Sequence, residues 1–154
     1  MKKTLITLIL GVSAGLAGAE PTVIQLWPEG VPGIKADIGP EKIGGGYNSN
    51  VSEPTLTMVG PAVDRPNGTA VIICPGGGYV RMSTAREGDQ YANWLSSLGV
   101  TSFVLKYRMQ EYGHPAPLQD VLRAVRMLRS RAAEFNINPA RICLLYTSPS
   151  PRDS

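Results

Sequence analysis

The chain has 154 residues, a length within the range of a single domain. Fifteen lysines and arginines against twelve aspartates and glutamates give a formal net charge of +3. So small an excess argues against a nucleic-acid-binding or membrane-surface protein, which would carry a concentrated basic patch.

Residues 1–19 have the pattern of a Sec-type signal peptide. Lys2 and Lys3 are the positive region, Leu5–Val12 is the apolar region, and Ala17-Gly18-Ala19 is a small-x-small cleavage site. Cleavage after Ala19 predicts a secreted or periplasmic protein that leaves the membrane. An uncleaved N-terminal anchor is the alternative. The residue directly after the cleavage site is Glu20 and not a cysteine, which argues against a lipoprotein.

The first half of the remaining chain predicts two strands after an irregular lead-in. Residues 20–50 are dense in Gly and Pro, so we expect an extended segment without helices. Residues 55–59 (TLTMV) alternate like a half-buried strand. Asp64–Gly68 (DRPNG) is a turn pattern. Residues 69–74 (TAVIIC) form a continuous apolar run, typical of a strand buried on both faces.

A helix is predicted over 87–98, because four apolar residues share one helical stripe and Gly99 can end the helix. These residues are Tyr91, Trp94, Leu95 and Leu98. Residues 100–105 (VTSFVL) predict a short buried strand.

A second helix is predicted over 118–135. Its inward-facing residues are expected to be Leu118, Val121, Leu122, Val125 and Leu128. We interpret its arginines as a solvated face and not as a binding patch. After a turn at 136–140, Arg141-Ile142 begins another strand. This alternation predicts an α/β fold with a mostly parallel sheet and flanking helices.

Residues 143–154 (CLLYTSPSPRDS) are predicted to be a non-native tail, leaving 20–142 as the native domain segment. Residues 143–153 fit one reading frame of a transposase adaptor used in sequencing libraries. A genuine polar tail is the alternative. Without the charged residues of both ends, twelve basic and eleven acidic residues remain, a balance of about +1. Cys74 is then the one native cysteine, so no disulfide framework is expected.

Three glycines, Gly76, Gly77 and Gly78, directly follow the buried strand. Without side chains they permit unusual backbone angles and leave their N–H groups unshielded. Rigidly held donors of this kind can stabilise an oxyanion in acyl transfer. A flexible turn and a phosphate nest are the alternatives. The spacing does not match G-x-G-x-x-G, and no P-loop Lys-Ser/Thr follows.

Several segments carry a combined pattern over Leu26–Ile142. They are LWPEGVPG (26–33), CPGGGY (74–79), Glu87-Gly88, WLSSLG (94–99), VLKYR (104–108), Asp120 with RAVR (123–126), and NPARI (138–142). Together they resemble bacterial secreted esterases of the α/β-hydrolase fold, the acetylxylan-esterase-like or feruloyl-esterase-like family.

The resemblance implies an α/β-hydrolase fold that is truncated before the nucleophile elbow. In such enzymes the strand after Arg141-Ile142 leads into G-x-S-x-G. Here the following residues lack that motif, and Ser148 lies between Thr147 and Pro149. The nucleophile, the acid and the histidine are expected downstream, so none is assigned to this chain.

The resemblance assigns roles only in the glycine loop. The amides of Gly77 and Gly78 would be the oxyanion-hole donors, and Gly76 would allow the turn. Tyr79 would line the substrate pocket, or alternatively pack as an aromatic at the strand end. Pro75 stands where many relatives carry histidine, which leaves the main-chain donors in place.

Two further residues are of types that often act in catalysis, but each has a simpler structural interpretation. His114 is the only histidine, and we interpret it as a surface-loop residue because it precedes the expected nucleophile. Cys74 has no histidine partner nearby in the sequence, so we interpret it as a small buried strand residue.

The sequence therefore predicts a secreted serine ester hydrolase. From the resemblance, its substrates would be short acyl esters or acylated oligosaccharides from plant polysaccharides, and it would need no metal or organic cofactor. The chain as given is expected to be inactive. A peptidase or lipase of the same superfamily is one alternative, and a non-catalytic secreted binding module is another. A short secreted protein with a genuine tail is a third, which uncovered apolar helix faces argue against.

Overall fold

The structure is a computed structural model that describes residues 21–62 and 66–147. The predicted signal peptide with its cleavage site at Ala19, the first part of the predicted 64–68 turn and residues 148–154 lie outside the described residues. Within the described ranges, no helix has the length and apolar character needed to cross a membrane.

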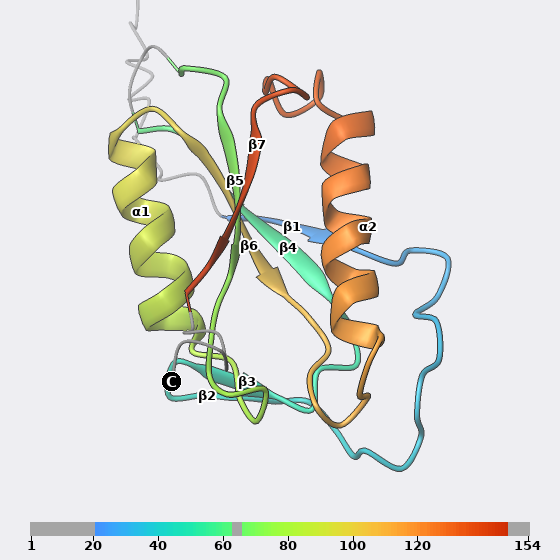
Figure 1. Cartoon of the computed structure of the whole chain (residues 1–154). Coiled ribbons are helices and arrows are strands. Elements are labelled where there is room, and N and C mark those ends of the chain that lie inside the picture. Colours follow the sequence, from blue (N-terminus) through green and yellow to red (C-terminus); the bar gives the residue numbers. More distant parts are fainter. Residues whose placement is uncertain (1–20, 63–65, 148–154) are drawn as a thin grey trace, which may run out of the picture.

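A five-stranded sheet with a helix on either side forms the body of the molecule (Figure 1). Its strands lie in the order β1-β4-β6-β5-β7. Their bounds are β1 (Thr22–Gln25), β4 (Thr55–Val59), β5 (Ala70–Cys74), β6 (Thr101–Lys106) and β7 (Ile142–Tyr146). A π-helical turn η1 (Thr84–Asp89) leads into α1 (Gln90–Ser97), and α2 (Ala116–Ser130) joins β6 to β7. A separate hairpin contains β2 (Lys42–Gly44) and β3 (Tyr47–Ser49).

The strands predicted at 55–59, 69–74 and 100–105 are confirmed to within one residue at each end. The segment 21–50 contains no helix, as expected, but β1, β2 and β3 were not predicted. Strands of three or four residues are too short to establish an alternating pattern. They form because partners are available: β1 pairs antiparallel with β4, and β2 pairs with β3.

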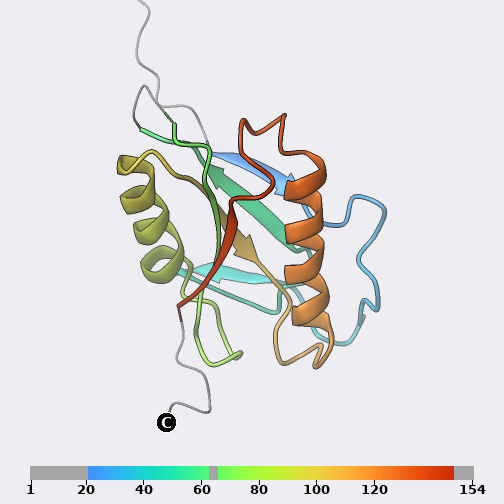
Figure 2. The same ribbon diagram turned by 45° about the horizontal axis from the view of Figure 1, so that its top comes forward.

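The sheet is mixed, with its parallel part next to the glycine loop. β5 is parallel to both β6 and β7, whereas β4 is antiparallel to β6. The chain moves from β5 to one neighbour through α1, and later crosses to the other side of β5 through α2. Since parallel crossovers are right-handed, the two helices must cover opposite faces, as Figures 1 and 2 show. A reversal of this kind opens a crevice at the carboxyl ends of the strands.

The turn η1 and helix α1 pack closely on the sheet through small residues. Ala92 is fully buried, and a β-carbon at Gly88 would lie 2.7 Å from Val104 Cγ1. The predicted apolar stripe is largely exposed, with Tyr91 at 42%, Trp94 at 58% and Leu98 at 54% exposure. The helix therefore buries its small-residue face, while most of its large apolar side chains remain uncovered in the described part of the chain.

The predicted inward face of α2 is wrong in part. Leu128 is buried and Val121 and Val125 are half-buried, but Leu118 and Leu122 are 48% and 42% exposed. The face against the sheet instead contains Ala116, Asp120, Ala124, Met127 and Leu128. The helix also ends at Ser130, before the predicted Phe135. Asp120 determines which face of the helix is directed at the sheet. A prediction from the hydrophobic pattern places such a charged residue on the solvent-exposed face.

Asp120 and Arg108 form a fully buried ion pair at the junction of β6 and α2. Asp120 is 0% and Arg108 1% exposed, and Arg108 Nη2 lies 2.7 Å from Asp120 Oδ1. The Arg108 backbone N–H and Nε also donate to the carboxylate, as does Trp27 Nε1 at 2.7 Å. Arg108 Nη1 donates to the Pro32 carbonyl. One carboxylate thus joins the N-terminal segment, the end of β6 and the first half of α2.

Breaking this pair is expected to destabilise the fold strongly. Asp120→Asn leaves the Arg108 charge buried without a counter-ion, at a cost of about 3–5 kcal/mol in the free energy of unfolding. Urea denaturation followed by tryptophan fluorescence measures this change.

The control is Glu134→Gln, which breaks the exposed Arg131–Glu134 pair of 2.6 Å. Because solvent screens exposed pairs, this variant is expected to unfold at the same urea concentration as the parent. Equal midpoints for Asp120→Asn and Glu134→Gln would contradict the central position of Asp120.

Candidate active site

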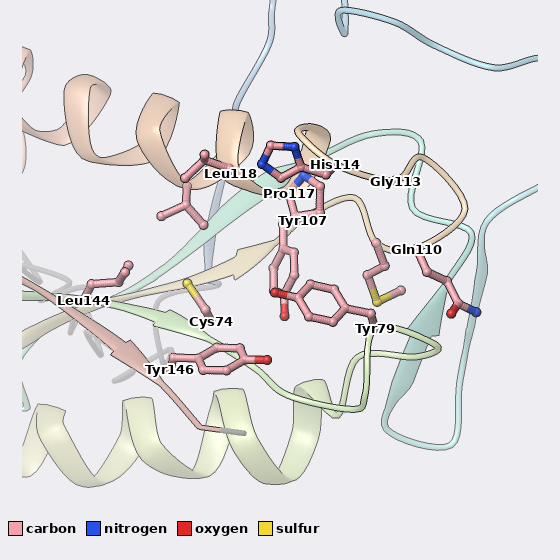
Figure 3. Close-up of a pocket in the computed structure, with 12 residues that line it drawn as sticks. Cys74, Tyr79, Tyr107, Gln110, Gly113, His114, Pro117, Leu118, Leu144 and Tyr146 are labelled. Carbon is pink, nitrogen blue, oxygen red and sulfur yellow. The ribbon is translucent and has the colours of Figure 1, made fainter. Parts of the chain in front are cut away.

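A cavity of about 590 Å³ lies where the three parallel strands end. Cys74 ends β5, Tyr107 follows β6 and Tyr146 ends β7, while the start of α2 provides the opposite wall (Figure 3). The lining residues are Cys74, Tyr79, Tyr107, Met109, Gln110, Gly113, His114, Pro117, Leu118, Val121, Leu144 and Tyr146. This location is the one expected for ligands in open α/β sheets.

The chemistry of the lining favours an uncharged ligand. Most of the lining side chains are aromatic or aliphatic, and none is a lysine or arginine. Tyrosine hydroxyls, Gln110 and His114 provide a few polar groups among them. A phosphate site would require compensating positive charge or several converging donors. The cavity therefore fits an acyl chain or a sugar ring better than a phosphate.

The glycine loop runs beside this cavity in a conformation that needs glycine. Gly77 has φ +140° and Gly78 has φ +64°, and a β-carbon at Gly77 would lie 1.8 Å from the Arg81 carbonyl oxygen. The Gly77 carbonyl accepts hydrogen bonds from Val80 and Arg81 N–H, which closes the loop. Neither the Gly77 nor the Gly78 amide donates to another described residue. Two amides are thus free to bind an external acceptor.

Tyr79 follows the glycines and places its ring at the cavity (Figure 3). Its φ of +60° is left-handed, a conformation that costs a non-glycine residue about 1–2 kcal/mol. Its carbonyl accepts a hydrogen bond of 3.2 Å from the Gln110 N–H, which ties the loop to the segment after β6. Tyr79 therefore lines the cavity with a partly exposed ring, and its role in a substrate pocket stays a prediction.

Cys74 and His114 both border the cavity, and their surroundings differ. Cys74 is 3% exposed, and burial raises the pKa of its thiol to about 12. A thiol of this kind is protonated at neutral pH and is a poor nucleophile. His114 is exposed in the loop before α2, as predicted. That His114 also lines the cavity was not predicted, because the loop's return towards β5 is a tertiary feature.

The cavity wall formed by the residues after β6 and the start of α2 was also not predicted. Met109, Gln110, Pro117 and Leu118 belong to this wall. Their only sequence signal is the Gly-His-Pro-Ala-Pro stretch, which marks a loop without indicating where the loop packs.

The first residues of the predicted non-native tail lie in β7. Cys143, Leu144, Leu145 and Tyr146 pair with β5 in parallel register, and Leu144 and Tyr146 line the cavity. The prediction that residues 143–154 are foreign to the protein stays a prediction.

No described residue takes the position of a nucleophile elbow. Ser148 lies outside the described residues, directly after Thr147. A G-x-S-x-G sequence does occur at Gly11–Gly15. It overlaps the predicted signal peptide, also lies outside the described residues, and precedes the glycine loop, whereas an elbow follows it in α/β hydrolases. Within 21–62 and 66–147, no group of three or more His, Cys, Asp or Glu could hold a metal ion.

Comparison with known proteins identifies related enzymes. The family described as BD-FAE matches residues 56–149, more than half of the chain. An acetylxylan esterase of Xylanibacter ruminicola is 38% identical over 76 residues, which cover 49% of this chain and 16% of that protein. Endo-1,4-beta-xylanase B of Butyrivibrio fibrisolvens is 34% identical over 79 residues, covering 49% of this chain and 12% of that protein.

Among solved structures, an acetyl ester-xyloside bifunctional hydrolase from Caldicellulosiruptor lactoaceticus superposes with a TM-score of 0.65 at 31% identity. The match covers 86% of this chain and 45% of that one. This likeness confirms the predicted α/β-hydrolase fold. The chain spans less than half the length of each of these relatives.

The left-handed backbone at Tyr79 predicts an inverted preference between alanine and glycine. In ordinary strands and helices, glycine is less stable than alanine by about 0.5–1 kcal/mol. At φ +60° the order should reverse, so Tyr79→Gly should be about 1 kcal/mol more stable than Tyr79→Ala. Both variants lose the ring, so the difference between their urea midpoints reports the effect of the backbone conformation on stability. A more stable alanine variant would contradict this conformation.

The buried thiol predicts selective labelling. In Cys143→Ser, only Cys74 can react with Ellman's reagent, and at pH 8 a pKa of about 12 leaves little thiolate. We expect reaction at least about 100-fold slower than in the urea-unfolded variant. Cys74→Ser, which retains the exposed Cys143, should react rapidly in the folded state. Equally fast reaction of both folded variants would show that Cys74 is not buried.

Proposed function

Because the chain belongs to the BD-FAE family, we propose that it is the N-terminal part of a secreted serine carboxylester hydrolase. The observation that carries this proposal is the pair of free amides, Gly77 and Gly78, beside an uncharged cavity. The esterase-named relatives support the reaction class, and the predicted signal peptide supports secretion to the periplasm or the medium.

In the proposed reaction, a serine Oγ attacks the carbonyl carbon of a bound ester and gives its proton to a histidine. The carbonyl oxygen becomes an oxyanion that the Gly77 and Gly78 N–H groups bind. The carbon–oxygen bond to the alcohol then breaks, and the histidine returns the proton to the leaving alcohol. Water hydrolyses the acyl-serine through the same steps. Removing one oxyanion donor costs about 3–4 kcal/mol of transition-state stabilisation in a typical enzyme of this type.

The proposed substrates are short acyl esters of plant-polysaccharide sugars. Two relatives carry names that refer to acetylxylan or to acetyl ester and xyloside hydrolysis. The cavity in this chain has room for more than an acetyl group, and its aromatic lining suits a sugar ring or an aliphatic chain. Tyr79 would contact this part of the substrate.

The catalytic serine, acid and histidine are proposed to follow Ile142 in the parent enzyme. Source DNA read past the Ile142 codon is expected to encode the rest of β7 and then G-x-S-x-G. The extended protein should hydrolyse p-nitrophenyl acetate and acetylated xylan, and changing the motif serine to alanine should abolish both activities. The 154-residue chain should be inactive. An intact source gene without a G-x-S-x-G after β7 would contradict the esterase proposal, and so would hydrolysis unaffected by the serine substitution.

A further inference from the structure

One peptide group of the glycine loop is held at both of its polar atoms. Tyr107 Oη donates a hydrogen bond of 2.7 Å to the Pro75 carbonyl oxygen. The Gly76 N–H, which belongs to the same peptide group, donates to Glu87 Oε2 at 3.0 Å. In a trans peptide the oxygen and the hydrogen point in opposite directions, so these two bonds hold the plane from opposite edges.

We propose that Tyr107 and Glu87 are positioning residues that aim the oxyanion donors of the next two peptide groups. This inference rests on the proposed ester hydrolysis. Neither residue needs to touch the substrate's reacting atoms for this role. Their effect on catalysis would pass through the orientation of the Pro75–Gly76 peptide.

Both residues are themselves held firmly. Tyr107 directly follows β6, is 5% exposed, and has its pKa raised chiefly by burial, so its hydroxyl stays protonated as a donor. Glu87 lies in η1, where its own N–H donates to the Ser83 carbonyl. The Ser83 N–H in turn donates to the Gly76 carbonyl at 2.8 Å.

The close packing of η1 against the sheet also restricts the movement of Glu87. A β-carbon at Gly88 would lie 2.7 Å from Val104 Cγ1 and 3.3 Å from Pro75 Cγ. Glycine at this position therefore lets η1 approach the sheet and Pro75, which brings the Glu87 carboxylate within reach of the Gly76 amide.

Thr147 completes the environment of this peptide. Its Oγ1 lies 3.1 Å from the Gly76 nitrogen and 2.8 Å from Glu87 Oε2, so it shares the amide and contacts the carboxylate. Pro75 has no N–H and no polar side chain of its own. In this structure, the orientation of the peptide therefore depends on Tyr107 after β6, on Glu87 in η1 and on Thr147 after β7, the last of which lies in the predicted non-native tail.

The orientation of the Gly77 and Gly78 N–H groups depends on the backbone angles of the residues that precede them. Once the Pro75–Gly76 peptide is released, ψ of Pro75 and both φ and ψ of Gly76 can change without compensating one another, because no β-carbon at Gly76 resists the change. The Gly77 and Gly78 amides, immediately downstream, then point elsewhere. A misplacement of about 1 Å can reduce a rate 100-fold, because oxyanion stabilisation depends on preorganised geometry.

The direct test observes the loop by NMR in the ¹⁵N-labelled 154-residue chain. In Tyr107→Phe and Glu87→Met, the Gly77 and Gly78 amide resonances should shift, and Gly76 amide exchange should accelerate at least about tenfold because one of the hydrogen bonds that hold its peptide is lost. Glu87→Gln keeps an acceptor oxygen and should restore parental exchange. Ile72 and Ile73 amides in β5 should be unchanged in every variant.

The matched control is Tyr112→Phe, which removes the hydroxyl of another buried tyrosine, one that makes no hydrogen bond to the glycine loop. Its glycine resonances should match those of the parent. Unshifted Gly76–Gly78 resonances in both Tyr107→Phe and Glu87→Met would overturn the proposal, as would equal shifts in Tyr112→Phe.

The catalytic arm uses the extended enzyme and p-nitrophenyl acetate. Tyr107→Phe and Glu87→Met should lower kcat about 10- to 100-fold with KM within about twofold, because the donors act mainly in the transition state. Glu87→Gln should recover most of kcat. Parental kcat in a variant with shifted loop resonances would refute the positioning role. Absence of ester hydrolysis in the unmutated enzyme would instead refute the proposed function, whatever the NMR result.

Discussion

The buried Arg108–Asp120 pair is the interaction on which the arrangement of the site depends. It joins the end of β6 to α2 and, through Trp27 and Pro32, to the N-terminal segment. Two buried charges need each other and several hydrogen bonds to offset their desolvation, so the pair permits few alternative packings of these elements. With Asp120 directed at β6, the first turn of α2 faces the carboxyl end of β5. The wall of the cavity opposite the glycine loop is therefore a consequence of this pair.

The site itself forms where local and tertiary constraints meet. Locally, three glycines allow the chain to leave β5 through backbone angles that other residues avoid. The tertiary part is a set of hydrogen bonds that the Pro75–Gly76 peptide makes with Tyr107 after β6, Glu87 in η1 and Thr147 after β7. Together they leave the Gly77 and Gly78 amides as donors without a described partner, beside a cavity without positive charge. A loop built in this way is suited to binding an oxygen that becomes negative only during a reaction.

The parts of this structure that could be predicted are those encoded by short-range patterns. β4, β5, β6 and the glycine loop have local signals of strand periodicity and backbone freedom. The inward face of α2 could not be read from its apolar residues, because Asp120 faces inward only in the presence of Arg108. Likewise Tyr107 looks like a residue at the end of a strand, and only the fold brings its hydroxyl to Pro75. The short strands β1 to β3 exist through their partners, not through their own composition.

The most direct measurement of the central claim is a crystal structure of the extended enzyme after reaction with a p-nitrophenyl phosphonate. The phosphoryl oxygen of the serine adduct occupies the position of the oxyanion in ester hydrolysis. This oxygen is expected at about 2.7–3.1 Å from both the Gly77 and the Gly78 nitrogen atoms, with the Tyr107 and Glu87 bonds to the Pro75–Gly76 peptide intact. An adduct whose oxygen is held by other groups, with neither amide within hydrogen-bond distance, would contradict it.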